Sequence, residues 1–284
     1  MLLPDHQRIH VIGAGGAGMS GLARLLAQSG HRVSGSDLVA GRPLLDLEEL
    51  GVEVWEGHRP ESVAAADLVV RSSAVPDRDP ELLAATEAGV ETWARPRLLD
   101  AITSNMRTIG ATGTHGKTTT TALMVAALDA AGPTPSFVVG GQLVDRGTNA
   151  AFNDPDRLVL EADEAFGTFL DLHLSGLVVT NVEPEHLDHY GDEAAMEEAF
   201  VEVMRRVDGP VVVCVDDPGA ERAMERAGGI SYGTDPGATW HIDDLEEGPL
   251  DVRFRLRHPD GDLPVRVGRP GLHVARDAAG ALAL

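Results

Sequence analysis

The sequence has very little lysine. Lysine and arginine together number 23 in 284 residues, and Lys117 is the only lysine. On a solvated surface either residue type serves, but a compact ammonium on a flexible stem reaches between phosphate oxygens in a way that a planar guanidinium does not. Lys117 lies in the segment Ala111-Thr-Gly-Thr-His-Gly-Lys-Thr-Thr119. The placing of this lysine therefore indicates a site for a nucleotide triphosphate.

The sequence also has a single cysteine, so no disulfide can form within the chain. Cys214 lies in the apolar run Val211-Val-Val-Cys-Val215, which predicts a buried strand residue and not a nucleophile. No signal peptide is visible, and glycine or charged residues interrupt the short apolar runs. We therefore expect a cytoplasmic protein with no membrane partner.

Positive charge is scarce as well. Aspartate and glutamate number 45, which gives a net charge of -22. Such a surface repels nucleic acid, so we expect no nucleic-acid partner, and an anionic ligand must be held by loop amides, a few arginines and metal ions. The length is sufficient for about two domains.

The segment around Lys117 matches the phosphate-loop pattern G-x-x-x-x-G-K-[ST], except that Ala111 holds the first glycine position. Backbone N–H groups of such a loop surround phosphates, the lysine reaches the outer phosphates, and the hydroxyl of Thr118 is placed to bind Mg²⁺. Residues 108–112 are typical of a strand and 118–131 of an alanine-rich helix, which puts the loop at a helix N-terminus. The alternative is an ordinary glycine-rich turn.

Residues 8–36 follow the order strand, glycine turn, helix, strand. A strand at 8–12 precedes Gly13-Ala-Gly-Gly-Ala-Gly18 and a helix at 19–28, and the strand at 31–36 ends at Asp37, where dinucleotide folds place an acidic residue for a ribose. Further strands at 52–55, 67–70 and 90–93 predict a five-stranded parallel, Rossmann-like sheet. The glycine pattern alone fits NAD(P), FAD, a sugar nucleotide or a turn without ligand, because any pyrophosphate satisfies amides at a helix N-terminus.

Acidic segments follow two later strands. The strand at 157–160 leads to Glu161, and the strand at 176–180 leads to the segment 181–189. Parallel strands of one sheet end at the same edge, so Glu161 and the cluster at 183–188, with His186, are candidate metal ligands beside the phosphate loop. Oxygen ligands with one imidazole suit Mg²⁺ or Mn²⁺. A helix cap at Glu161 and a hydrogen-bonded loop histidine at His186 are the alternatives.

Four blocks together resemble the Mur ligases, the ATP-dependent amide-forming enzymes of peptidoglycan precursor synthesis. Residues 112–121 are similar to the loop of the subgroup with His before Gly-Lys, and residues 13–23 with 34–37 are similar to members that join L-alanine to UDP-N-acetylmuramate. Glu161-Ala-Asp-Glu164 and the segment 180–188 follow in the family's order. The resemblance implies an α/β protein with a UDP-sugar-binding Rossmann-like domain at residues 1–105 and a central P-loop ATPase-type domain at 106–284.

The resemblance also implies roles. ATP would phosphorylate the lactyl carboxylate of UDP-N-acetylmuramate, and L-alanine would attack the acyl phosphate, so the catalytic groups neutralise charge. Lys117 would neutralise the transferring phosphoryl group, and His115 would contact the substrate carboxylate or phosphate. Thr118, Glu161 and His186 would hold or position Mg²⁺ or Mn²⁺. The residues assigned to ATP are Gly113, Thr114, His115, Gly116, Lys117, Thr118, Thr119 and His273. The residues assigned to the UDP-sugar are Gly13, Ala14, Gly15, Gly16, Ala17, Gly18, Met19, Ser36, Asp37, Ser72 and Ser73.

The sequence departs from the family pattern near its end. Where the family has His-Asn-x-x-Asn for adenine, this chain has His273-Val-Ala-Arg-Asp277, so Val274 and Asp277 replace both amides. The family continues into a third domain beyond the position of Leu284. We therefore expect a two-domain fragment, monomeric or homodimeric, that binds its nucleotides without completing catalysis.

Three other functions stay open. A recycling ligase attaches a preformed peptide to the same sugar nucleotide. An oxidoreductase with NAD(P) on the first loop leaves Lys117 and Glu161 unexplained. A non-catalytic nucleotide-binding module is the third.

Overall fold

The computed structural model describes residues 2–284, apart from the side chain of Phe166. The chain forms two compact units. The first contains the residues up to Met106 together with Pro135–Leu158, and the second contains Arg107–Thr134 together with Val159–Leu284.

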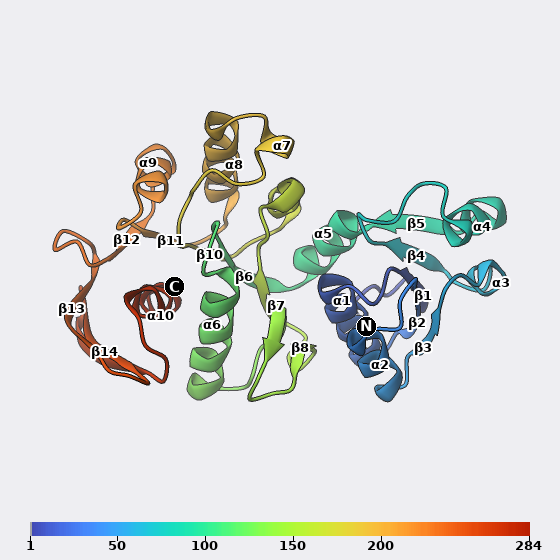
Figure 1. Ribbon diagram of the computed structural model, residues 1–284, viewed down its shortest axis with the longest axis horizontal. Helices are drawn as coiled ribbons and strands as arrows, with labels where there is room; N and C mark the ends of the chain where they lie inside the picture. The colour runs from blue at the N-terminus through green and yellow to red at the C-terminus, as the bar shows by residue number, and fades with distance from the viewer. Residues whose placement is uncertain (1) are drawn as a thin grey trace. The chain divides into compact units, whose positions relative to one another are not determined.

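The first unit is a parallel sheet with helices. Its elements are β1 (Arg8–Ile12), α1 (Ala17–Gln28), β2 (Arg32–Asp37), α2 (Arg42–Glu49), β3 (Glu53–Glu56), α3 (Pro60–Val63), β4 (Leu68–Arg71), α4 (Pro80–Ala88), β5 (Glu91–Ala94), α5 (Arg95–Asn105), β7 (Ser136–Leu143) and β8 (Thr148–Ala151). The strand order is β3-β2-β1-β4-β5, all parallel (Figure 1). The central strands β1 and β4 are buried apolar runs, as expected where helices cover both faces of a sheet. The predicted five-stranded Rossmann-like sheet is confirmed.

An antiparallel hairpin of β7 and β8 packs on α1 in this unit. Gly21 of α1 permits the close approach, because a Cβ there would lie 3.2 Å from Asn149 Nδ2 and 3.3 Å from Val138 Cγ1. Asn149 Nδ2 also donates a hydrogen bond to Ala17 O at 2.8 Å. The sequence analysis placed residues 135–158 in the second domain, and the structure packs them with the first unit. A domain boundary at residue 105 stays a prediction.

The second unit is a mixed sheet covered by helices. Its elements are β6 (Arg107–Thr112), α6 (Lys117–Ala131), β9 (Arg157–Glu161), the 3-10 helix η1 (Ala165–Asp171), β10 (Gly176–Val179), α7 (Leu187–Tyr190), α8 (Glu193–Arg206), β11 (Val211–Cys214), α9 (Pro218–Ala227), β12 (Ile230–Gly233), β13 (Trp240–Glu247), β14 (Val252–His258), β15 (Gly261–Val267) and α10 (Leu272–Ala283). The order within this unit is β15-β14-β13-β12-β11-β10-β6-β9. Helix α6 packs against α10, and α8 packs against α9 on the other side of the sheet (Figure 1). The predicted P-loop α/β fold class is confirmed.

The strands of this sheet change direction at one side. Strands β6 and β10 to β13 run parallel, whereas β14 and β15 are antiparallel additions that the sequence analysis did not anticipate. Cys214 is buried in β11, as predicted, and burial raises the pKa of its thiol to about 11. In residues 2–284 no helix has the length and apolar character needed to cross a membrane.

Candidate nucleotide sites

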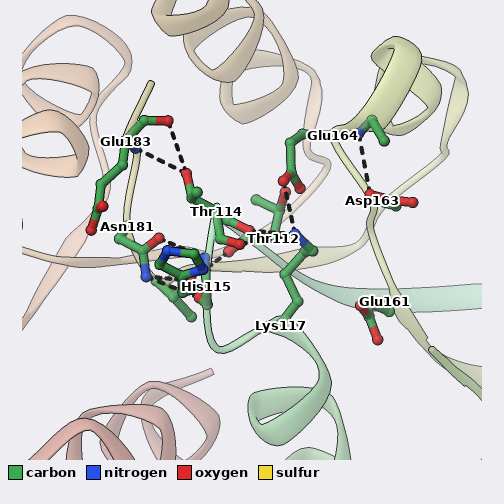
Figure 2. Close-up of polar contacts among 12 residues, drawn as sticks. Thr112, Thr114, His115, Lys117, Glu161, Asp163, Glu164, Asn181 and Glu183 are labelled. Atoms are coloured by element: carbon green, nitrogen blue, oxygen red, sulfur yellow. Dashed lines mark hydrogen bonds and ion pairs between the residues drawn. The ribbon is translucent and has the colours of Figure 1, made fainter. Parts of the chain in front are cut away.

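The loop between β6 and α6 carries Lys117 at the first turn of the helix (Figure 2). Gly113 has φ +130°, and a Cβ on it would lie 2.2 Å from Thr180 Oγ1. Gly116, the N-cap of α6, has φ +85°. Residues other than glycine rarely adopt these backbone conformations, so the two glycines allow the tight turn of the loop before the helix. The first N–H groups of α6 lack intrahelical partners and are available to phosphate oxygens.

The end of β10 and the residues after it hold the loop in place. His115 N donates to Asn181 Oδ1 at 2.7 Å, and Asn181 Nδ2 donates to His115 O at 2.9 Å. Thr180 Oγ1 lies 2.6 Å from His115 O, and Glu183 N donates to Thr114 Oγ1 at 2.9 Å (Figure 2). Because these contacts come from a neighbouring parallel strand, the loop is shaped before any ligand binds.

The ammonium of Lys117 folds back over the loop. Its Nζ donates to Gly113 O at 2.8 Å, to Thr114 O at 3.3 Å and to Glu164 Oε1 at 2.8 Å (Figure 2). Glu164 is 1% exposed, and burial raises the pKa of its carboxyl although the hydrogen bond from Lys117 opposes this. The lysine is thus held beside the loop by a buried carboxylate.

The candidate metal ligands form two groups. Thr118 Oγ1 lies 3.1 Å and 3.0 Å from the two carboxylate oxygens of Glu161. His186 does not join them as one set; it lies with Glu164 and Glu185, and one ligand atom of each is within 4.8 Å of the others. In the described chain Glu164 Oε2 is buried without a hydrogen-bond partner. The sequence analysis treated Glu161 and His186 together and did not name Glu164 as a ligand, because its contact with Lys117 and His186 depends on the tertiary fold.

A cavity of about 520 Å³ adjoins the phosphate loop. Five residues assigned to ATP or flagged in the adenine motif line it: His115, Gly116, Thr119, His273 and Asp277. Its wall also contains Arg276, whose Nε donates to Asp216 Oδ2 at 2.6 Å. Val274 is buried in α10 and does not line it. The cavity has the size and polar lining of a nucleotide site.

The glycine loop of the first unit lies between β1 and α1. Gly13 N and Ala14 N donate to Ser36 O at 2.8 Å and 2.9 Å, and Gly15 N donates to Asp37 Oδ2 at 2.9 Å. Asp37 therefore already accepts a bond from a loop amide. Gly16 is the N-cap of α1 with no side-chain cap, so the first amides of this helix are open to an anion.

A cavity of about 220 Å³ lies at this loop. Of the residues assigned to the UDP-sugar, it is lined by Gly13, Gly16, Ser36, Asp37 and Ser72. The others do not line it: Ala14 and Met19 are buried in the core, and Gly15, Ala17, Gly18 and Ser73 are absent from its wall.

Arg95 is a basic residue near this loop that the sequence analysis missed. A Cβ on Gly18 would lie 3.2 Å from Arg95 Cζ, so the guanidinium rests against the first turn of α1. Its Nε is buried and has no hydrogen-bond partner among the described residues. Arg97, two positions on, instead pairs with Glu91 at 2.8 Å and covers the ring of Trp93. The sequence offered one signal for Arg95: basic residues are scarce, so each arginine near a glycine-rich loop was a candidate ligand-binding residue. That its Nε lacks a hydrogen-bond partner could be seen only in the structure.

The fold and the Lys117 loop define an α/β protein with a loop of the P-loop type. The chain belongs to the Mur ligase family: residues 8–107 match the Mur ligase family catalytic domain, and residues 111–284 match the Mur ligase middle domain.

Similar proteins are named as ligases of UDP-N-acetylmuramate. The chain is 43% identical to a UDP-N-acetylmuramate–L-alanine ligase of Thermobifida fusca over 98% of this chain and 60% of that protein, and 40% identical to one of Clavibacter michiganensis over 98% and 58%. The crystal structure of UDP-N-acetylmuramate–alanine ligase from Thermotoga maritima has a TM-score of 0.86 at 25% identity, covering 97% of this chain and 64% of that chain. The chain thus spans about 60% of the length of the curated relatives it matches.

Proposed function

We propose that this chain carries the sugar-nucleotide and ATP sites of a ligase that joins L-alanine to UDP-N-acetylmuramate in cytoplasmic peptidoglycan precursor synthesis. The observation that carries the proposal is the 43% identity to the Thermobifida fusca ligase along 98% of the chain. The preformed loop around Lys117 supports it, because an acyl-phosphate route needs a site for a nucleotide triphosphate.

In this reaction ATP transfers its γ-phosphoryl group to the lactyl carboxylate, and the amine of L-alanine then displaces phosphate from the acyl carbon. Catalysis of phosphoryl transfer consists mainly of positioning and charge neutralisation. The Lys117 ammonium, placed over the loop, is suited to stabilise charge on the transferring group, and the uncapped N–H groups at the start of α6 are suited to bind the other phosphates. His115 lies on the wall of the adjoining cavity, and its contact with the reacting carboxylate stays a prediction.

The carboxylates beside the loop fit Mg²⁺ or Mn²⁺. Thr118 with Glu161, and His186 with Glu164 and Glu185, offer the oxygen and imidazole ligands that these ions accept. The buried Glu164 Oε2 has no partner in the described residues, which is the expected state of an atom that binds an ion. The cation would neutralise phosphate charge that one lysine cannot balance alone.

The glycine loop of the first unit is the proposed site for the UDP pyrophosphate. The open amides of the first turn of α1 and the Arg95 guanidinium supply positive charge, which a surface of net charge -22 otherwise lacks. Ser36 and Ser72, on the cavity wall, are placed to bind hydroxyl or phosphate oxygens.

A recycling ligase is the second candidate. The structure of UDP-N-acetylmuramate:L-alanyl-gamma-D-glutamyl-meso-diaminopimelate ligase from Neisseria meningitides has a TM-score of 0.83 at 25% identity, covering 98% of this chain and 92% of that chain. Both candidates share the sugar nucleotide and ATP, so they differ only in whether L-alanine or a peptide is attached.

Calorimetric titration of the chain with UDP-N-acetylmuramate, Mg-ATP and NADH tests the proposal. We expect both the sugar nucleotide and ATP to bind and NADH not to bind. Binding of NADH without the UDP-sugar would overturn the assignment of the first loop. A ligation assay separates the two candidates. It uses a protein as long as the curated relatives and compares L-alanine with the peptide as the group that is attached.

A further inference from the structure

Asp277 is a buried carboxylate on the wall of the nucleotide cavity. It belongs to α10, is 7% exposed and lines the cavity together with His115 and Thr119. A Cβ built on Gly116 would lie 2.6 Å from Asp277 Oδ1. The carboxylate oxygen therefore sits directly over the N-cap of α6, beside the amides that the phosphate loop offers to a ligand.

No cation balances this carboxylate in the described part of the chain. Its neighbour Arg276 pairs with Asp216 at 2.6 Å, and Lys117 is held by Glu164. The titratable and charged groups that line the cavity around Asp277 come from four other places along the chain and from α10 itself. They are His115 before α6, Glu183 after β10, Cys214, Asp216 and Asp217 at the end of β11 and just after it, Tyr232 in β12, and His273 and Arg276 on α10. Strand β10 has no titratable residue, and the arginines of β14 and β15 pair with the carboxylates of the same ribbon.

We propose that Asp277 must carry a proton when a nucleotide triphosphate occupies this cavity, so that nucleotide binding takes up a proton on this side chain. The inference rests on the proposed ATP site. In the empty loop the positive N-terminus of α6 favours the charged carboxylate. A bound polyphosphate takes those same amides and places negative charge beside Oδ1, so the charged form becomes unfavourable.

The titration of Asp277 lies in an accessible range. Burial raises the pKa of its carboxyl to about 7, although the Thr120 hydroxyl opposes the shift. Because the bound polyphosphate raises this pKa further, the complex binds more protons than the free protein above neutral pH. By linkage, nucleotide affinity then falls as pH rises above about 7, by at most about tenfold per pH unit. Below that range Asp277 is already neutral, and the affinity becomes independent of this group.

The matched variant is Asp277→Asn, which keeps the shape of the side chain and is neutral at every pH. We expect the Kd of wild-type protein for Mg-ATP to increase about tenfold or more from about pH 7 to about pH 9, and that of the variant to increase much less. All the other titratable groups of the cavity are retained in the variant, so any pH dependence that it keeps belongs to those groups or to the nucleotide. Equal pH profiles for the two proteins would overturn the proposal.

A second measurement uses wild-type protein alone. Calorimetric titration with Mg-ATP at about pH 8, in buffers of different ionisation enthalpy, should report uptake of close to one proton, and a value near zero contradicts the inference. Failure of the proposed function is distinguishable, because then neither protein binds Mg-ATP at any pH. If both bind and only the proton uptake is missing, the ATP site stands and the role of Asp277 is wrong.

Discussion

At the scale of single residues, Lys117 affects two quantities: the affinity for nucleotide, through its ammonium, and the stability of the folded protein, through its ion pair with Glu164. We predict that Lys117→Ala weakens Mg-ATP binding by about 1.5 to 3 kcal/mol, the usual scale for a hydrogen bond to a charged group. The variant also leaves Glu164, 1% exposed, without its cation, so it should unfold at lower temperature.

The double variant Lys117→Ala/Glu164→Gln separates the two quantities. It removes the buried charge and should recover most of the lost thermal stability without recovering nucleotide affinity. Calorimetric titration and thermal unfolding measure the two effects. An Lys117→Ala protein with unchanged affinity would show that the loop is not a triphosphate site.

Arg95 and Arg97 provide a matched pair of arginines two positions apart. Arg95 rests against Gly18 with a buried Nε, whereas Arg97 is engaged with Glu91 and Trp93. We predict that Arg95→Ala weakens binding of UDP-N-acetylmuramate by about 1.5 to 3 kcal/mol and that Arg97→Ala changes it little. Titration of both variants measures this, and equal losses would mean that the guanidinium near α1 does not contact the ligand.

At the scale of elements, a buried polar network joins β1, β2 and β3 to α4. Glu81 of α4 accepts bonds from Ser36 Oγ and from Trp55 Nε1, the latter at 3.0 Å, and lies 3.6 Å from Nε2 of His10. Burial opposes the charge of Glu81, but the nearby His10 imidazole and the hydrogen bonds from Ser36 Oγ and the Arg59 N–H outweigh it and lower the pKa to about 2. Since Ser36 O also accepts the Gly13 and Ala14 amides, this network supports the glycine loop.

A pH-dependent stability follows from that pKa. We predict that Glu81→Gln lowers the free energy of unfolding by about 3 kcal/mol near neutral pH, the order of magnitude that corresponds to a carboxyl pKa lowered from 4.5 to about 2. The folded-state pKa is below the ordinary value, so the advantage of wild type is complete above about pH 4.5 and is lost as pH falls toward about 2. Urea unfolding across this range measures it. Glu87→Gln, on the exposed side of α4, is the control, and an equal loss there would contradict the prediction.

The elements that could be predicted are those with a strong local signal. The parallel strands could be predicted from buried apolar runs such as Val211-Val-Val-Cys214, and the two loops from the glycine turns before α1 and α6. The β7–β8 hairpin was missed because its strands are mixed in composition and their place depends on packing against α1. The ribbon of β13 to β15 was missed although β14 alternates buried Val252, Phe254 and Leu256 with exposed arginines.

The candidate site was predictable only in outline. Strand order places Glu161 and the segment 181–189 at the loop edge, so those positions followed from the sequence. Which acid accompanies His186 did not follow, because that depends on how the chain turns after β9 and β10, where His186 itself has φ 53°. The burial of Asp277 against Gly116 is likewise a tertiary contact with no local signal.

At the scale of the whole molecule, the excess of negative charge opposes compaction. Carboxylates number 45 against 23 lysines and arginines, so the net charge of -22 repels itself across the surface. Exposed ion pairs act in the other direction, for example Arg226 with Glu197 and Glu198. Such pairs contribute about 0 to 1 kcal/mol each, and salt screens them as well. At low salt the long-range repulsion outweighs these pairs, because the carboxylates far outnumber the basic residues.

We therefore predict that added salt stabilises the protein. From about 0.01 M to about 0.1 M NaCl the Debye length falls from about 30 Å to about 10 Å, so repulsion between distant carboxylates is screened while contacts at ion-pair distance are weakened less. The midpoint of thermal unfolding should rise by a few degrees over this range, and calorimetry of the nucleotide-free protein measures it. The Glu81→Gln variant should show the same rise, because Glu81 is buried and its interactions are short-range. A midpoint that falls with salt would mean that local ion pairs outweigh the net charge in holding the two units folded.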